Sequence, residues 1–156
     1  MIENSINLTL LIFHFVLIKS LLQKMGIKNM IKGLGIDIVE VKRIKKMKRR
    51  WQERFLTKIF TEQEIDYCQS KKNSAQHLAA RFAAKEALVK CLGTGFRNIS
   101  LIDIEVIKDN QGKPVLKVYG RARELVEKKG IEKLHISLSH EKKYAVAEVI
   151  GEGGFK

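Results

Sequence analysis

The sequence predicts an α+β fold, a single domain in which helices pack on an antiparallel sheet. Its length of 156 residues and its hydrophobic content of 45% are sufficient for one buried core. The spacing of apolar residues changes along the chain between two residues, typical of a half-buried strand, and three to four residues, typical of an amphipathic helix. The last two alternating segments are separated only by a short turn, which favours an antiparallel hairpin.

The first strand and the first helix of this domain follow each other directly. Alternation of Leu34, Ile36 and Ile38 with their neighbours predicts a half-buried strand over residues 34–39. The helix that follows has one apolar stripe, made of Val41, Ile44, Met47, Trp51 and Phe55. Its other faces carry seven basic residues and no acidic one: Lys42, Arg43, Lys45, Lys46, Lys48, Arg49 and Arg50. That surplus exceeds what solubility requires and favours an acidic partner.

Capping residues mark the next two helices. Thr61 with Glu64 three residues later is a capping-box signal for a short helix. Ser74 is expected to cap the longest helix, from Ala75 to about Leu92, and Gly93 to end it in a left-handed conformation. The remaining elements are, in order, a strand over 102–106, a turn at 109–112, a strand over 115–119, a helix over 121–129 and a hairpin of strands over 134–138 and 144–150.

The first thirty residues differ from the rest of the chain. The apolar run Leu8–Leu22 is short for a membrane span, which needs about 20 apolar residues. It also lacks the basic stretch and the small-residue cleavage site of a signal peptide. We therefore expect residues 1–29 to be an extension and residues 30–156 to be the domain, with Met30 as the functional start. A single amphipathic membrane anchor is the alternative.

The charge balance points to an anionic partner. Thirty basic residues against 17 acidic ones give a net charge of +13, which attracts nucleic acid, anionic lipid, phosphorylated small molecules and acidic proteins alike. Cys68 and Cys91 have neither C-x-x-C spacing nor a regular framework, so a disulfide scaffold or a zinc site is disfavoured. We expect a cytoplasmic protein.

Two carboxylates interrupt the hydrophobic pattern. Glu86 lies on the apolar stripe of the longest helix, and Asp37 lies inside the apolar first strand, where burial disfavours a charge. A salt bridge from Glu86 to Lys90 or Arg81, and an edge strand with one wet face at Asp37, would account for them structurally. Alternatively, both converge on Mg²⁺, which typically takes one or two protein carboxylates and completes its shell with water and substrate phosphate.

Three further features are candidates for phosphate contacts. Lys90 lies one helical turn beyond Glu86, and it is either a phosphate ligand or a solvated lysine. The loop Gly93-Thr94-Gly95 follows a helix, whereas the known phosphate-binding loops precede one, so it is a weak motif or a plain helix stop. His140 lies where a strand meets a turn, a frequent place for functional residues, although surface histidines are common there too.

Taken together, these segments resemble the bacterial holo-acyl-carrier-protein synthase family of 4′-phosphopantetheinyl transferases. The matching segments run in family order from Met30 to about Ile150. They are Ile31–Glu40 through Arg43, Phe60-Thr61 with Glu64, Ala80–Ala87 through Lys90, Gly93–Gly95, Gly112–Pro114, and Ile136–His140 followed by Tyr144-Ala145. The combination of the G-x-D strand with the F-A-x-K-E-A helix is far more specific than either alone.

The resemblance implies the 4′-phosphopantetheinyl transferase fold and a homotrimer whose active sites lie between subunits. It makes Asp37 and Glu86 the Mg²⁺ ligands, with Glu86, Lys90 and His140 as catalytic residues. The implied coenzyme A contacts are Arg81, Lys90, Gly93, Thr94, Gly95 and His140. The first helix would contact the acidic apo-acyl carrier protein through Arg43, Lys46, Met47 and Arg50.

The implied reaction is attack by the carrier serine on the β-phosphorus of coenzyme A, which expels adenosine 3′,5′-bisphosphate. Magnesium and Lys90 would offset the developing negative charge. The proton acceptor stays open between Glu86 and a water on the metal. A nucleic-acid-binding protein is the first alternative, since its basic footprint fits a pI near 9.8, but it leaves Asp37 and Glu86 without a role. A membrane-surface protein is the second. We expect neither a nucleic-acid partner nor stable membrane association.

Overall fold

The computed structural model describes residues 14, 16–18, 20–21, 29–95 and 99–154. The predicted extension at residues 1–29 therefore lies almost wholly outside the described residues. Within the described ranges, no helix combines the length and the apolar character needed to cross a membrane. Residues Ile31–Gly153 form one unit, which is the domain considered below.

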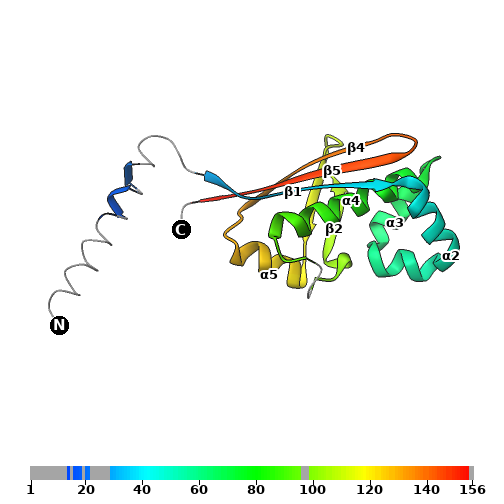
Figure 1. Cartoon of the computed structure of the whole chain (residues 1–156), viewed down its shortest axis with the longest axis horizontal. Coiled ribbons are helices and arrows are strands. Elements are labelled where there is room, and N and C mark those ends of the chain that lie inside the picture. The colour runs from blue at the N-terminus through cyan, green and yellow to red at the C-terminus, as the bar shows by residue number, and fades with distance from the viewer. Residues whose placement is uncertain (1–13, 15, 19, 22–28, 96–98, 155–156) are drawn as a thin grey trace. The chain divides into compact units, whose positions relative to one another are not determined.

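The domain has the predicted α+β composition (Figure 1). Its elements are β1 (Asn29–Glu40), α2 (Val41–Ile59), α3 (Glu62–Gln69), α4 (Ser74–Leu92), a 3₁₀ turn (Leu101–Asp103), β2 (Ile104–Lys108), β3 (Pro114–Val118), α5 (Gly120–Lys128), β4 (Lys133–His140) and β5 (Tyr144–Gly154). Each predicted strand and helix is present, with ends shifted by a few residues. Ile102 is an exception, because it belongs to the 3₁₀ turn rather than to the strand.

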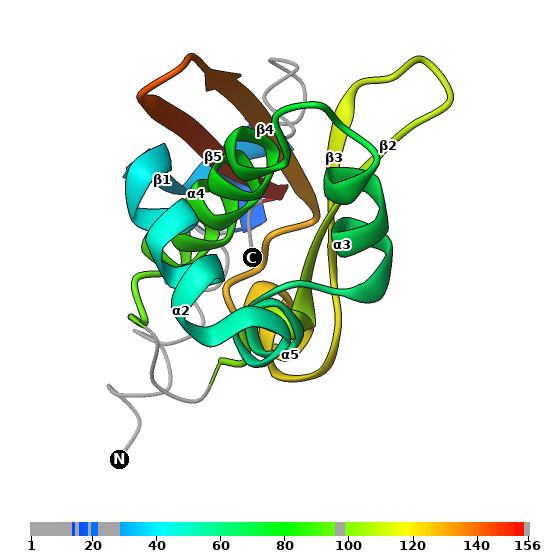
Figure 2. The same ribbon diagram turned by 90° about the vertical axis from the view of Figure 1, so that its right-hand side faces the viewer.

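The strands form two sheets rather than one. A three-stranded sheet has the order β1-β5-β4, and β2 pairs with β3 in a separate sheet. The predicted hairpins are both antiparallel, with Ile136 opposite Val149 and Val106 opposite Leu116. Helix α4 runs along the three-stranded sheet, with β1 on one side of it and the β2–β3 sheet on the other (Figure 2).

Strand β1 lies unusually close to α4 because it carries glycines at the contact. A Cβ atom on Gly35 would lie 2.0 Å from the carbonyl oxygen of Ala87, and one on Gly33 would lie 2.2 Å from that of Cys91. Only glycine fits at such distances. The face of β1 that carries Asp37 therefore packs towards α4. The alternation in the sequence is confirmed, but its large apolar residues point outward, with Leu34, Ile36 and Ile38 being 54%, 56% and 62% exposed.

The predicted apolar stripe of helix α2 is confirmed in part. Val41, Ile44 and Phe55 are buried, and Met47 packs partly against the core. The prediction for Trp51 is wrong, since its side chain is 50% exposed. Gln52 adopts φ 43° and ψ −127°, which interrupts the helix directly after Trp51. The chain returns to the core through Phe55 beyond this kink, so the helical spacing does not continue across it.

The capping predictions have different outcomes. The Thr61 capping box is present: the Thr61 amide donates to Glu64 Oε2 at 3.0 Å, and the Glu64 amide donates to Thr61 Oγ1 at 3.4 Å. Gly93 ends α4 with φ 71°, as expected for a left-handed residue. Ser74, however, is the first helical residue and not the cap. Asn73 occupies the cap position and makes no side-chain capping hydrogen bond.

Candidate functional site

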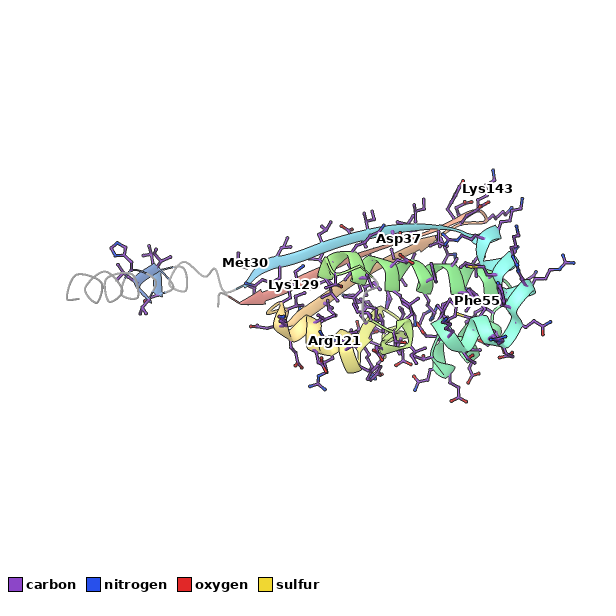
Figure 3. The ribbon with its side chains drawn as sticks, turned by 60° about the horizontal axis from the view of Figure 1, so that its bottom comes forward. Met30, Asp37, Phe55, Arg121, Lys129 and Lys143 are labelled. Carbon is purple, nitrogen blue, oxygen red and sulfur yellow. The ribbon has the colours of Figure 1, made fainter. Side chains whose placement is uncertain are left out.

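The first cluster of candidate residues lies where β1 passes α4, and we call Asp37, Glu86 and Lys90 the carboxylate cluster. Asp37 is on β1, where Figure 3 labels it, and Glu86 and Lys90 are on α4. Asp37 Oδ1 accepts a hydrogen bond from Lys90 Nζ at 2.8 Å, and Lys90 also donates to the Ile36 carbonyl at 2.9 Å. The close approach of the glycine-bearing strand thus brings the two predicted carboxylates together.

The two carboxylates share an environment that favours a cation. Burial raises the pKa of Glu86 above its ordinary value, and the neighbouring negative charge of Asp37 raises it further. Lys90 and Arg43 oppose this shift only in part. The structural alternative of a Glu86 salt bridge is not found in the described ranges, because Lys90 pairs with Asp37 and no ion pair joins Glu86 to Arg81.

The donor set fits a hard divalent cation that brings phosphate with it. Asp37 and Glu86 supply two carboxylates, and within the described ranges no hydrogen bond or ion pair competes for the Glu86 oxygens. Among the residues described, no group of three or more acidic, histidine or cysteine side chains could enclose a metal alone. Mg²⁺ is commonly held by one or two carboxylates and completes its shell with water and phosphate oxygens.

The second cluster is a small cavity on the other side of α4. We call it the basic pocket, and it contains Tyr67, His77, Arg81, Lys108 and His140. Its volume is about 210 Å³. These side chains come from α3, α4, β2 and β4, so four separate elements build it.

Arg81 is the central cation of the basic pocket. Its side chain is 5% exposed, and its guanidinium carbon lies 4.2 Å from the centroid of the Tyr67 ring. Its Nε atom is buried and has no hydrogen-bond partner within the described part of the protein. A buried donor without an acceptor is costly, so this geometry favours an anionic ligand.

Neighbouring residues make the whole pocket electropositive. The His77 and His140 rings pack edge to face with centroids 4.9 Å apart. Burial lowers the pKa of His77, and the charges of His140 and Arg81 lower it further. Burial also opposes ionisation of Tyr67, but the hydrogen bond and charge of Lys108 together with the charges of Arg81 and Lys71 outweigh it, so the pKa of Tyr67 falls below its ordinary value. The contributions of nearby cations to both shifts indicate a site that attracts negative charge.

The carboxylate cluster and the basic pocket face different directions. Glu86 follows His77 by nine residues, about two and a half helical turns, which puts them on opposite faces of α4. Asp37 and His140 lie on β1 and β4, the two edges of a sheet in which β5 is the middle strand. One chain therefore brings Glu86 and Lys90 together with Asp37, but it places His140 and Arg81 elsewhere.

The other predicted contacts lie in the loop after α4 and on α2. Gly93, Thr94 and Gly95 form the turn after α4, beyond Lys90, and both glycines have positive φ values of 71° and 61°. On α2, the predicted carrier contacts Arg43, Lys46 and Arg50 are exposed, and Met47 is half-buried. We call these four residues of α2 the carrier stripe. The charge of Arg43 reaches Glu86.

A buried ion pair next to Glu86 was not predicted from the sequence. Lys85 Nζ lies 2.6 Å from Glu64 Oε2, and both side chains are fully buried. The same nitrogen donates to three backbone carbonyls, those of Ile59, Leu101 and Ile104, at 2.6 to 2.9 Å. From the sequence, a lysine in an alanine-rich helix would be expected to face solvent. The capping box at Glu64 indicated a charged residue at the start of α3 but not its buried partner.

Tyr67, His77 and Lys108 were also missed. Each is an ordinary polar residue of its own helix or strand, and they meet only because α3, α4 and β2 pack together. Their local sequence spacing carries no signal of this contact. Arg81 was identified only through the family resemblance.

Comparisons with known proteins found relatives that match most of this chain. Residues 33–149 match the family described as the 4′-phosphopantetheinyl transferase superfamily. The holo-[acyl-carrier-protein] synthase of Halothermothrix orenii is 54% identical over 125 residues, which cover 80% of this chain and 100% of the relative. That of Syntrophus aciditrophicus is 49% identical over 80% of this chain and 98% of the relative.

Solved structures give the same relationship. A holo-(acyl-carrier-protein) synthase from Bacillus anthracis in complex with CoA (3′,5′-ADP) is 39% identical with a TM-score of 0.65, covering 80% of this chain and 99% of that one. The Helicobacter pylori enzyme in complex with coenzyme A is 32% identical with a TM-score of 0.66, covering 74% and 96%.

Proposed function

The chain belongs to the 4′-phosphopantetheinyl transferase superfamily, and we propose that it transfers the 4′-phosphopantetheine group from coenzyme A to a serine of apo-acyl carrier protein. The products are holo-acyl carrier protein and adenosine 3′,5′-bisphosphate. The observation that carries this conclusion is the near-complete coverage of holo-[acyl-carrier-protein] synthases at up to 54% identity. The nucleic-acid alternative leaves the carboxylate cluster without a role.

The carboxylate cluster would hold Mg²⁺ through Asp37 and Glu86. The ion, when bound, neutralises negative charge on the pyrophosphate and orients it for attack. Lys90 is 53% exposed and sits beside Asp37, so its ammonium group can turn to a phosphate oxygen. Either Glu86 itself or a water held by the metal would accept the serine proton, since a carboxylate that binds Mg²⁺ is a weaker base.

The basic pocket would hold the phosphates at the nucleotide end of coenzyme A. Arg81 is buried and pre-oriented, and its guanidinium would supply the central positive charge for a phosphate group. His140 and Lys108 add further donors at the same cavity. The coenzyme A complexes of the Bacillus anthracis and Helicobacter pylori relatives support a coenzyme A site in this fold.

We propose that the active form is a homotrimer with its active sites between subunits. In the described chain, the carboxylate cluster and the basic pocket lie on opposite faces of α4, so one protomer's cluster needs another protomer's pocket. The exposed Leu34, Ile36 and Ile38 give β1 an apolar stripe that a neighbouring copy would cover. Ile36→Glu should therefore yield a monomer by light scattering and abolish transfer, whereas a trimeric, active variant would contradict the assembly.

The acidic carrier protein would dock on the carrier stripe, which lies next to the carboxylate cluster through Arg43. We place the reaction in the cytoplasm, without stable membrane association and without a nucleic-acid partner. Cys68 and Cys91 are both free and buried, as is usual in a reducing compartment.

A mass measurement tests the proposed activity directly. The purified full chain is incubated with an apo-acyl carrier protein and coenzyme A, with Mg²⁺ or with a chelator. We expect the carrier to gain the mass of phosphopantetheine only in the presence of Mg²⁺, and adenosine 3′,5′-bisphosphate to appear in equal amount. No mass gain with Mg²⁺ on any acidic carrier protein would reject the proposal.

A further inference from the structure

A second and larger cavity lies away from both clusters. It has a volume of about 780 Å³ and lies between α2, the start of α4 and the turn that joins β4 to β5. We call it the cationic cavity because five of its lining residues are basic: Lys45, Lys48, Arg49, Lys72 and Lys142. The rest of the lining is amide and hydroxyl side chains with one alanine.

The cationic cavity has no internal counter-charge. No acidic residue lines it, and none of its five cations forms an ion pair with any described residue. Glu141 is adjacent in sequence to Lys142, but its carboxylate accepts hydrogen bonds from the amides of Lys143 and Tyr144 at 2.8 and 2.9 Å. Five like charges around one concave surface repel one another unless an anion binds between them.

The cationic cavity and the carrier stripe occupy neighbouring parts of the surface of α2. Successive helical residues are rotated by about 100°, so Lys48 points about 200° away from Lys46. The Lys48 side chain also contacts α4, because its Nζ donates a hydrogen bond to Ser74 Oγ at 3.4 Å. Arg49, by contrast, is rotated by only about 60° from Lys46, so the cavity borders the carrier stripe and a ligand there would lie beside a docked carrier protein.

The shape and chemistry of the cavity select a small ligand. Its volume falls within the range of about 300–1,000 Å³ that is usual for small-molecule sites. Ala75 is the one apolar side chain among the lining residues, so the cavity offers no large apolar side chain to hold an acyl chain or a hydrophobic peptide. Four of the five cations are lysines, whose compact charges suit clustered phosphate oxygens. The start of α4 adds the partial positive charge of a helix N-terminus that Asn73 does not cap.

We propose that the cationic cavity binds a small multivalent phosphate anion, a compound that carries a diphosphate or triphosphate group. Binding would neutralise the positive charge of α2 beside the carrier stripe. The site is independent of the transferase activity, so it can be tested whether or not that activity is present.

The test is a calorimetric titration of the full chain with inorganic tripolyphosphate at physiological salt, which suppresses diffuse charge attraction. The cavity variant combines Lys45→Gln, Lys72→Gln and Lys142→Gln. The control combines Lys58→Gln, Lys117→Gln and Lys128→Gln, which are exposed elsewhere and remove the same charge. We expect the cavity variant to lose about tenfold in affinity and the control to lose much less.

Amide shifts locate the bound anion. In the wild-type chain, tripolyphosphate should move the backbone amide signals of Ser74 and Gln76 in ¹⁵N correlation spectra. Equal losses in the cavity and control variants, or shifts confined to the basic pocket around Arg81, would overturn the proposal. If the triple variant melts at a lower temperature than the wild type, Lys142→Gln alone carries the test, because this residue lies on an exposed turn.

Discussion

The carboxylate cluster and the basic pocket are built in opposite ways. Backbone geometry builds the first, since Gly33 and Gly35 let β1 lie against the carbonyls of α4 and so bring Asp37 to Glu86. Side-chain packing from four elements builds the second, around a buried Arg81. The carboxylate cluster therefore depends on a few glycines, whereas the basic pocket depends on the whole tertiary arrangement.

Removal of one charge from the carboxylate cluster should have the largest effect. Glu86→Gln should lower kcat/KM about a thousand-fold, because the loss of a metal ligand costs several kcal/mol of transition-state stabilisation. Stability should not fall, since the change removes a desolvated charge that repels Asp37. Activity and melting temperature are measured together, with Glu127→Gln as the charge-matched control on exposed α5. Near-normal activity of Glu86→Gln with Mg²⁺ would falsify the metal assignment.

Mixing two inactive variants tests whether the clusters act across subunits. Arg81→Gln should be nearly inactive at low coenzyme A, because it removes the central cation of the basic pocket. It is then refolded with an equal amount of Glu86→Gln. In random trimers, about a quarter of the interfaces join a subunit with intact Glu86 to a neighbour with intact Arg81, so about a quarter of the wild-type activity should return. Should Arg81→Gln fail to fold, His140→Ala replaces it. A mixture as inactive as its components would place both clusters in one subunit's site.

Charge reversal on the carrier stripe should have a smaller effect that is specific to one substrate. Lys46→Glu with Arg50→Glu should raise the KM for the carrier protein about tenfold, with much less change for coenzyme A, because the stripe steers an acidic partner. The salt dependence of the rate should flatten. Lys117→Glu with Lys128→Glu is the control. If the KM for the carrier protein at low salt does not change, the stripe is only a solvated surface and does not bind the carrier.

The smallest expected effect is a shift in the titration of His77. In the free protein its pKa lies below the ordinary value because of burial and nearby cations. Coenzyme A phosphates in the basic pocket should raise it, since a neighbouring anion favours the protonated ring. Imidazole signals in NMR spectra follow both states. A pKa that stays constant or falls on coenzyme A binding would place the phosphates elsewhere.

The same pKa shift predicts a pH dependence of stability. Because folding lowers the pKa of His77, the unfolded chain binds the proton more readily, and stability is lost as the pH falls below the ordinary histidine pKa. Coenzyme A should reduce this loss. Urea denaturation with and without coenzyme A, between neutral and mildly acidic pH, measures both.

The contrast between the two clusters also explains what the sequence could predict. Asp37 and Glu86 interrupt local hydrophobic patterns, so a strand and a helix alone marked them as anomalies, and the family resemblance then favoured their convergence on a metal over separate structural roles. His77, Tyr67 and Lys108 interrupt no pattern, and their meeting depends on packing between distant segments. The kink at Gln52 and the outward apolar face of β1 escaped prediction for the same reason, since a kink and a glycine contact change which residues face the core.

The Lys85 ammonium group has a consequence for cooperativity. It is bonded to the end of α2, to α3, to the 3₁₀ turn and to β2, and it has no access to water. Detachment of any one of these elements would leave a buried charge less than fully paired, which is strongly destabilising. These elements should therefore open as a single unit, and the amide protons around Lys85 should exchange with solvent only when the whole domain unfolds.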